Sequence, residues 1–236
     1  MIVVFDSGLG GLTALDSLVK RYPQKHFLFY GDRENAPYGN KSVKELRKIF
    51  DGHAQRFAQE GVKDVLLQCN TMCSVLDLEA YPFRMHDIIS LTLQQCEALP
   101  RDSRILVCAT AATIKRGRYQ QGLQEMGFAQ VEGCALKELA GMIERFASKE
   151  EVLSYLQEEL PAGKFDYVIL GCTHYPIHAE LFQEVTGGET IDSTDLSYDF
   201  LDEDEEGGLE LCLKKDDELE AFLQQQLHVP YRWAHE

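Results

Sequence analysis

Two short apolar runs in this chain end in nearly the same phrase. Residues 65–68 read Val-Leu-Leu-Gln and lead into Cys69-Asn70-Thr71, while residues 168–171 read Val-Ile-Leu-Gly and lead into Cys172-Thr173-His174. A side chain at the carboxyl end of a parallel strand, just before a helix, stands where open α/β sheets hold their ligands. The repeated phrase therefore predicts an α/β protein whose site contains two thiols.

Short apolar segments alternate with amphipathic segments along most of the chain. Strands of parallel sheets read as near-continuous apolar runs, because crossover helices cover both faces. The pattern therefore predicts mainly parallel sheets flanked by helices. We expect strands at residues 2–6, 26–31, 64–69, 88–91, 105–109, 130–134, 167–172 and 189–192. Helices are expected at residues 11–21, 42–60, 73–79, 93–98, 114–126, 136–147, 149–159 and 178–185.

Equal spacings along the chain indicate two lobes of similar topology. Asp6, at the end of the first predicted strand, precedes Cys69 by 63 residues, and Ala109 precedes Cys172 by the same 63 residues. The alternative explanation is coincidence, because spacings within βαβ units are stereotyped. We favour two similar lobes with the ligand site in the cleft between them, a common place for pockets.

The end of the chain follows a different pattern. An acidic run at 202–206 followed by two glycines predicts a solvated turn, and the alternation at 209–213 predicts a half-exposed strand. Asp216 can cap a last helix whose apolar face carries Leu219, Phe222, Leu223 and Leu227. We expect this segment to pack on the first lobe, which makes that lobe discontinuous. The expected lobes are residues 1–92 with 195–236, and residues 93–194.

Charge and hydropathy exclude several classes of partner. The formal net charge of −16 argues against nucleic acid and anionic membranes. No apolar run approaches the ~20 residues that span a bilayer, and residues 2–5 predict a buried strand rather than a signal peptide. The seven cysteines follow no zinc spacing. We therefore expect a cytoplasmic protein with reduced thiols and no metal.

Cys69 and Cys172 are the candidate catalytic residues. A helix start supplies partial positive charge, which lowers the pKa of a thiol from about 8.5 and favours the reactive thiolate. The alternative for each is a small buried side chain, since free cysteine is commonly interior. Recurrence of the setting favours the functional interpretation. The other cysteines lack it and are interpreted as packing residues: Cys73, Cys96, Cys108, Cys134 and Cys212.

A glycine-rich turn, Asp6-Ser7-Gly8-Leu9-Gly10-Gly11, follows the first predicted strand. Its backbone N–H groups can face an anion, but Thr13 replaces the third glycine of a dinucleotide fingerprint. Asp6 is either an N-cap or a carboxylate that binds a cationic amine, and we favour the second. Tyr38-Gly39 lies in a rigid Pro/Gly turn. Thr110 and Thr113 are either helix caps or hydroxyl donors to a bound carboxylate.

Together these blocks resemble the glutamate racemases of the cofactor-independent aspartate/glutamate racemase superfamily. The resemblance runs nearly end to end, and the run Gly171-Cys172-Thr173-His174-Tyr175-Pro176 is highly specific for that family. The other matching blocks are Phe5-Asp6-Ser7-Gly8, Pro37-Tyr38-Gly39, Cys69-Asn70-Thr71, Thr110 with Thr113, and Ile191-Asp192-Ser193. The resemblance implies an enzyme that interconverts L- and D-glutamate without a cofactor and supplies D-glutamate for peptidoglycan synthesis. It also implies that a homodimer is a common assembly.

By the same resemblance, Cys69 removes the α-proton of the D-isomer and Cys172 reprotonates the opposite face, with the roles exchanged in the other direction. Asp6 and His174 correspond to residues that assist the two thiols. The positions that match ligand contacts are Asp6, Ser7, Tyr38, Gly39, Asn70, Thr71, Thr173 and His174, with Thr110 and Thr113 as further candidates. Inversion needs an acid and a base on opposite sides of the α-carbon. Preorganised local donors can hold the developing charge on a strongly acidic protein.

The chain departs from the family pattern at several positions. Gln68 stands where a small residue is common, and Met72-Cys73 replaces the usual Ala-Ser. The family motif that includes a later acidic residue is altered here. Glu138 and Glu144 are therefore both candidates for that acidic residue.

Three alternatives to glutamate racemisation stay open at this point. A racemase of aspartate or another acidic amino acid would differ in the depth of its pocket. A catalytically inactive amino-acid-binding relative would have no need for two matched thiols. A hydrolase with a cysteine nucleophile needs one cysteine paired with a histidine and an acid, and it leaves the second thiol unexplained.

Overall fold

The structure is a computed structural model that describes residues 1–194, 196–198, 201 and 207–234. The chain divides into two compact units, Met1–Ile88 with Ser197–Glu236 (unit 1) and Ile89–Leu196 (unit 2). These bounds lie within four residues of the lobes expected from the sequence. The acidic run at 202–206, which we predicted to be a turn, lies outside the described residues.

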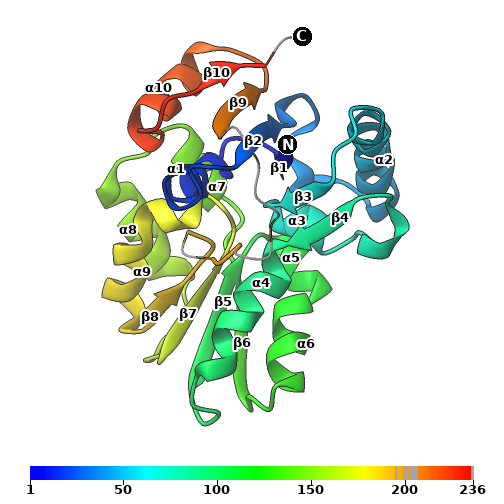
Figure 1. The fold of residues 1–236 in the computed structure, drawn as a ribbon. Helices are drawn as coiled ribbons and strands as arrows, with labels where there is room; N and C mark the ends of the chain where they lie inside the picture. Colours follow the sequence, from blue (N-terminus) through cyan, green and yellow to red (C-terminus); the bar gives the residue numbers. More distant parts are fainter. Residues whose placement is uncertain (195, 199–200, 202–206, 235–236) are drawn as a thin grey trace. The chain divides into compact units, whose positions relative to one another are not determined.

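Unit 1 is built on a six-stranded sheet with the order β10-β9-β2-β1-β3-β4, and every pairing in it is parallel (Figure 1). The strands are β1 (Ile2–Asp6), β2 (His26–Gly31), β3 (Asp64–Leu67), β4 (Arg84–Asp87), β9 (Gly208–Cys212) and β10 (Arg232–Trp233). The helices are α1 (Leu12–Arg21), α2 (Val43–Gln59), α3 (Asn70–Cys73) and α10 (Asp217–Gln226). Three 3-10 turns complete the set: η1 (Arg33–Asn35), η2 (Tyr38–Asn40) and η3 (Leu78–Ala80).

Unit 2 is built on a four-stranded parallel sheet with the order β6-β5-β7-β8. The strands are β5 (Arg104–Ala109), β6 (Gln130–Ala135), β7 (Tyr167–Gly171) and β8 (Glu189–Ile191). The helices are α4 (Ile88–Gln95, which begins at the last residue of unit 1), α5 (Ala111–Arg116), α6 (Arg118–Glu125), α7 (Leu139–Glu144), α8 (Lys149–Glu159) and α9 (Ala179–Thr186), with 3-10 turns η4 (Cys96–Ala98) and η5 (Tyr175–His178). The predicted fold class, with two parallel sheets flanked by helices, is confirmed.

The two sheets share one strand plan. In unit 1 the central strand β1 lies between β2 and β3, and in unit 2 the central strand β5 lies between β6 and β7. The register is also shared, because Ile2 pairs with Asp64 and Ile105 pairs with Tyr167, an offset of 62 positions in both cases. This common offset accounts for the equal spacing of the two candidate cysteines. Each cysteine therefore emerges at the same place relative to its central strand.

Unit 1 packs around β1, and the C-terminal segment of the chain returns to this unit. β1 is buried at every position, and Phe50 and Phe57 of α2 pack edge-on against Phe5. The end of the chain returns to this unit, because β9 pairs with β2 and α10 contacts α1. Asp216 Oδ1 caps α10 by accepting a hydrogen bond from the Leu219 N–H at 2.9 Å. The predicted strand, cap and return of the tail are confirmed.

Two predicted elements near the thiol of unit 1 are wrong. Residues 88–91, expected as a strand, begin α4, and the strand is β4 instead. The Asp64 carboxylate of β3 accepts hydrogen bonds from Arg84 of β4 at 2.8 Å and 2.7 Å and contacts His86 at 2.9 Å. These polar contacts fix a strand that has no apolar pattern. The helix expected at 73–79 is also displaced, because α3 begins immediately after Cys69 and ends at Cys73.

Two other predicted helices are shorter than expected. The helix expected at 114–126 is interrupted by Gly117, whose φ of 71° ends α5 before α6 begins. The helix expected at 136–147 is observed only as α7. Among the described residues, no helix has the length and apolar character needed to cross a membrane.

The close approach of Gly11 to Asp6 generates a prediction about stability. A Cβ at Gly11 would lie 2.8 Å from the Asp6 Cβ and 2.9 Å from a Phe29 ring carbon. Gly11→Ala should therefore lower the free energy of unfolding by about 1–3 kcal/mol, through overpacking. Gly52→Ala is the matched control, because an added Cβ there meets nothing within 4 Å. In the interior of α2 this change should stabilise by about 0.5–1 kcal/mol.

Urea unfolding followed by circular dichroism measures both variants. Equal midpoints for Gly11→Ala and the unmodified chain would contradict the predicted clash.

Candidate active site

The candidate site residues form two groups, one in each unit. We call the residues around Cys69 the first half-site and the residues around Cys172 the second half-site. Each is built where a strand beside the central strand of its sheet reaches its carboxyl end. This is the edge at which parallel α/β sheets carry their ligand sites.

Cys69 lies between β3 and α3 and is 5% exposed. Its thiol donates a hydrogen bond to Ser7 Oγ at 3.3 Å. Ser7 follows the last residue of β1, and β1 pairs directly with β3. The parallel register of these two strands therefore brings the hydroxyl and the thiol together.

Asp6 is almost fully buried at the end of β1. Its Oδ1 accepts a hydrogen bond from the Gly8 N–H at 2.9 Å, which shapes the first turn of the glycine-rich loop. The Asp6 carbonyl also accepts the Asp32 N–H at 2.9 Å and so extends the pairing of β1 with β2. The carboxylate is thus held by backbone on the same strand end that presents Ser7.

Asp32 organises a second polar cluster in unit 1. Its carboxylate accepts hydrogen bonds from the Tyr38 hydroxyl at 2.5 Å and from Asn35 Nδ2 at 2.9 Å. His53 Nε2 lies 3.1 Å from the same carboxylate, although its ring N–H is not aimed for a hydrogen bond. Burial alone would raise the pKa of Asp32, but the contacts from His53, Tyr38 and Asn35 outweigh it and hold that pKa below its ordinary value.

Tyr38 is buried and stays a neutral phenol. Burial raises the pKa of its hydroxyl well above the ordinary value, and the Asp32 carboxylate acts in the same direction. Negative charge on Cys69 and Asp6 also raises this pKa. The adjacent Gly39 is exposed, and a Cβ added there meets nothing within 4 Å. The packing of unit 1 therefore gives no steric reason for a glycine at that position.

Asn70 and Thr71 are the first two residues of α3, and both are buried. The Thr71 carbonyl accepts a hydrogen bond from Ser74 Oγ at 2.6 Å, which secures this single turn of helix. Behind it, the Cys73 thiol donates to the Leu67 carbonyl at 3.2 Å. Cys73 and Met72 are fully buried, so these two departures from the family pattern are interior packing residues.

The second half-site is a chain of three side chains in unit 2. His174 Nδ1 lies 3.7 Å from the Cys172 sulfur, and His174 Nε2 lies 2.9 Å from Glu144 Oε1. Cys172 and His174 are both 7% exposed, whereas the Glu144 side chain is 39% exposed. Cys172 follows β7 directly and Glu144 ends α7. Of the two acidic residues left open by the sequence, Glu144 is the one in contact with the histidine.

The contacts of His174 favour its charged form. Burial lowers its pKa, but the contacts with Cys172 and Glu144 are stronger together and raise the pKa well above the ordinary value. Glu138, by contrast, is exposed, and its backbone N–H donates to the Tyr155 hydroxyl at 3.2 Å.

Thr173 is buried next to Cys172. Thr110 follows β5 as Ser7 follows β1, and its Oγ1 lies 3.0 Å from Thr113 Oγ1. Thr110 also accepts a hydrogen bond from the Thr113 N–H at 3.3 Å and so caps α5. The capping interpretation of Thr110 is therefore confirmed, while its role as a donor to ligand stays a prediction.

Sequence reasoning missed the supporting roles of Asp32 and His53. Asp32 carried a signal, because it directly follows a predicted strand and precedes a Pro/Gly turn. His53 carried none, because it stands among polar residues in the middle of α2. Among the described residues, no group of three or more histidine, cysteine, aspartate or glutamate side chains is arranged to hold a metal ion.

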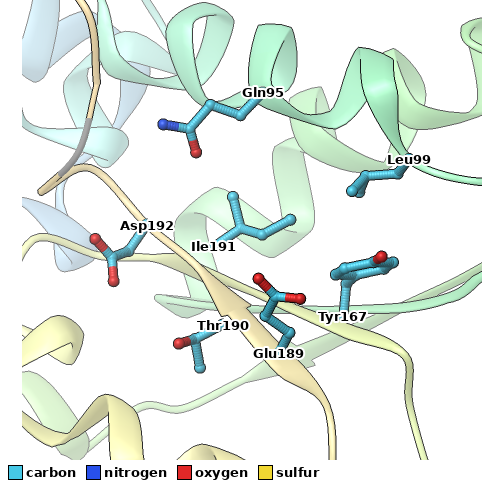
Figure 2. Close-up of a pocket in the computed structure, with 7 residues that line it drawn as sticks. All are labelled: Gln95, Leu99, Tyr167, Glu189, Thr190, Ile191 and Asp192. Atoms are coloured by element: carbon cyan, nitrogen blue, oxygen red, sulfur yellow. The ribbon is translucent and has the colours of Figure 1, made fainter.

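A separate hollow in unit 2 contains none of the predicted site residues. Gln95 and Leu99 line one side, and Tyr167 with residues 189–192 lines the other (Figure 2). Asp192 belongs to one of the sequence blocks that carry the family resemblance. Its carboxylate accepts hydrogen bonds from the Thr194 backbone at 2.8 Å and the Thr194 hydroxyl at 2.6 Å. These bonds indicate a structural role for Asp192 at the end of β8.

Comparison with known proteins finds similar sequences. Residues 18–200 match the family model for Asp/Glu/Hydantoin racemase. A glutamate racemase from Thermoanaerobacter pseudethanolicus is 30% identical over 210 residues, which cover 85% of this chain and 79% of the relative.

Solved structures share the fold of this chain. A glutamate racemase isoform from Bacillus anthracis superposes with a TM-score of 0.89 at 23% identity, covering 99% of this chain and 96% of that chain. A glutamate racemase from Francisella tularensis in complex with D-glutamate superposes with a TM-score of 0.77 at 25% identity, covering 99% of this chain and 95% of that chain.

The contact between His174 and Glu144 generates a prediction about pH dependence. Glu144→Gln should lower the pKa of His174, which carbon-13 or nitrogen-15 NMR of labelled histidines can follow. His178 is an internal reference, because burial places its pKa below the ordinary value and Glu144 is not among the causes. No shift of the His174 titration in Glu144→Gln would contradict the predicted charge pairing.

The sign of the stability effect follows from the raised pKa. A histidine whose pKa is raised on folding stabilises the protein fully below its unfolded pKa of about 6.5, and that contribution is lost as pH rises through the folded pKa. The stability difference between the unmodified chain and Glu144→Gln should therefore be larger at about pH 6 than above the folded pKa of His174.

Proposed function

The chain belongs to the Asp/Glu/Hydantoin racemase family, and we propose that it interconverts L- and D-glutamate with Cys69 and Cys172 as the two proton-transfer groups. The observation that supports this most strongly is the equivalent placement of the two thiols. Each follows a strand that pairs with the central strand of its sheet at the same offset of 62 positions. Each also has its own polar partner, Ser7 in unit 1 and His174 in unit 2.

Inversion at a carbon centre assigns complementary roles to the thiols. One thiolate takes the α-proton from one face, and the other thiol donates a proton to the opposite face of the resulting carbanion. In this proposal Cys69 takes the proton of D-glutamate and Cys172 takes the proton of L-glutamate. The two sulfurs exchange protonation states in each turnover, so the enzyme must reset them before the same isomer reacts again.

The surroundings of Cys172 support its action as a base. His174 Nδ1 lies 3.7 Å from the Cys172 sulfur and can exchange a proton with it, while Glu144 contacts the other ring nitrogen and orients the ring. A positioned carboxylate that orients an imidazole is a recurring arrangement in acid–base sites. Glu144 is therefore proposed as a positioning residue for His174.

The surroundings of Cys69 are different, because the hydrogen-bond partner there is the neutral hydroxyl of Ser7. Asp6 supplies a buried carboxylate on the same strand end and is proposed to bind the substrate ammonium group or to assist Cys69. Tyr38 is proposed to stay a neutral phenol. Its hydroxyl can donate a hydrogen bond to the ligand only if it gives up the hydrogen bond that it donates to Asp32. Hydroxyl, amide and backbone donors are proposed to hold the carboxylates and the developing charge, namely Ser7, Gly39, Asn70, Thr71, Thr110, Thr113 and Thr173.

Glutamate is proposed as the substrate because the relative from T. pseudethanolicus, which matches most of the chain, carries the name glutamate racemase. The wider proposal is a cytoplasmic homodimer that supplies D-glutamate for peptidoglycan synthesis. Its net charge of −16 disfavours binding to nucleic acid and to anionic membranes. No cofactor takes part in the proposed proton transfers.

The substrate test is direct. The purified chain, without added cofactor, is incubated in deuterated water with L-glutamate, D-glutamate or L-aspartate. Circular dichroism follows inversion, and proton NMR follows loss of the α-proton signal. We expect inversion of both glutamate isomers with deuterium entering at the α-carbon. Turnover of aspartate but not glutamate would reassign the substrate, and no turnover of any of them would contradict a racemase.

Single cysteine variants test the assignment of the two bases. Cys69→Ala and Cys172→Ala should each lower kcat in both directions by at least about 100-fold, because general acid–base groups contribute about 10²–10⁴. Cys212→Ala is the matched control, because this half-buried thiol on β9 belongs to neither half-site. Circular dichroism confirms folding of each variant. Wild-type racemisation by either of the first two variants would overturn the two-thiol mechanism.

A further inference from the structure

Two cysteines outside the half-sites lie opposite each other in the sheet of unit 2. Cys108 of β5 is the register partner of Cys134 of β6. Register partners on parallel strands point to the same face and lie about 4.8 Å apart in the direction of the backbone hydrogen bonds. A disulfide needs a Cα separation of about 4.4–6.8 Å, so the strand pairing already satisfies this requirement.

The two side chains belong to the same apolar cluster. Cys108 is one of its buried members, and Cys134 packs against it as a partly buried side chain. The Cys134 thiol donates to the Glu159 carbonyl oxygen at the end of α8, at 3.4 Å. Both thiols therefore lie on the same face of the sheet. Among the described residues, β6 is an edge strand that pairs with β5 alone.

Cys108 and Cys134 differ in burial and in the direction of their pKa shifts. Cys108 is fully buried in the apolar core, whereas Cys134 is half-buried at its border. The neighbouring Cys108 thiol lowers the pKa of Cys134, while burial raises the pKa of Cys108. Thiols that react with oxidants are accessible, are more ionised, and often have a second cysteine nearby.

The remaining buried cysteines of the core lack this arrangement. Cys73 and Cys96 donate their thiols to backbone carbonyls, those of Leu67 and Thr92. Cys212 is half-buried like Cys134, but its register partner on the neighbouring strand is Tyr30. Cys108 and Cys134 thus differ from these three cysteines in being register partners on neighbouring strands.

We propose that Cys108 and Cys134 form a reversible redox pair, in which a hydroperoxide oxidises Cys134 and Cys108 then closes a disulfide. In the first step the Cys134 sulfur attacks the outer peroxide oxygen, an S–O bond forms and the O–O bond breaks. The proton of the Cys134 thiol passes to the leaving oxygen, so the products are a sulfenic acid and an alcohol, or water from hydrogen peroxide. In the second step the Cys108 sulfur attacks the Cys134 sulfur, and the hydroxyl leaves as water with the Cys108 proton. A dithiol reductant restores both thiols.

Peptide mapping tests the proposal on the full, reduced chain. Hydrogen peroxide is added in increasing amounts, free thiols are alkylated, and the protein is digested with trypsin. Cleavage after lysine and arginine places Cys108 alone in fragment 105–115 and Cys134 alone in fragment 119–137. We expect these two fragments to become linked and to separate again after treatment with dithiothreitol. Cys212, located from fragment spectra, is the internal reference for a thiol of similar exposure.

Two variants separate the steps. In Cys108→Ser, Cys134 should accumulate as a sulfenic acid that a cyclic 1,3-dione traps. In Cys134→Ser, Cys108 should remain unoxidised at the peroxide concentrations that link the pair in the unmodified chain. The alanine variants replace the serine variants if circular dichroism shows loss of folding.

Three results would each overturn the proposal. The first is oxidation of Cys134 to the sulfinic acid without any link to Cys108. The second is oxidation of Cys108 in Cys134→Ser at the same peroxide concentration. The third is oxidation of Cys212 at peroxide concentrations that leave Cys134 reduced.

Discussion

Parallel pairing of neighbouring strands is the constraint on which both half-sites depend. Backbone hydrogen bonds between β1 and β3 fix Ser7 beside Cys69, and the same kind of ladder between β5 and β7 fixes the position of Cys172. A shift of one residue would turn the neighbouring side chains to the opposite face of the sheet. Buried strands resist such a shift, because apolar side chains cover both faces. The reactive sulfurs are therefore positioned by backbone that has no part in the chemistry.

The two half-sites share a strand plan but differ in charge. A hydroxyl contacts Cys69, while Cys172 is contacted by an imidazole whose other nitrogen meets a carboxylate. The first half-site holds its carboxylates close by instead, in Asp6 and in the Asp32 cluster. Equivalent strand ends thus carry different electrostatic surroundings. Two thiols that work on opposite faces of the substrate do not need identical surroundings, and the side chains that contact Cys69 and Cys172 differ.

Much of this arrangement could be predicted from the sequence, because apolar runs and spacing report backbone pairing. The strand ends at Cys69 and Cys172 and the return of the tail followed from such patterns. β4 could not be found in this way, because ion pairs of Asp64 rather than apolar side chains fix it. The choice between Glu138 and Glu144 also needed coordinates, since both residues flank the same short helix.

Contacts between residues far apart in the sequence could not be predicted either. His53 reaches Asp32 from the middle of a helix, and nothing in its neighbours along the chain indicates that contact. Cys108 and Cys134 each look like packing residues when taken alone. Their relation appears only when the register of β5 and β6 is known.

The discontinuity of unit 1 has a consequence for synthesis on the ribosome. Unit 2 is continuous in sequence, so all of its strands have been made before Gly208–Cys212 emerges. Until then the outer edge of β2 lacks the strand that pairs with it in the finished sheet. An unpaired edge can template association with other chains. The nascent protein must therefore carry an open sheet edge for as long as ribosomes take to translate the whole of unit 2.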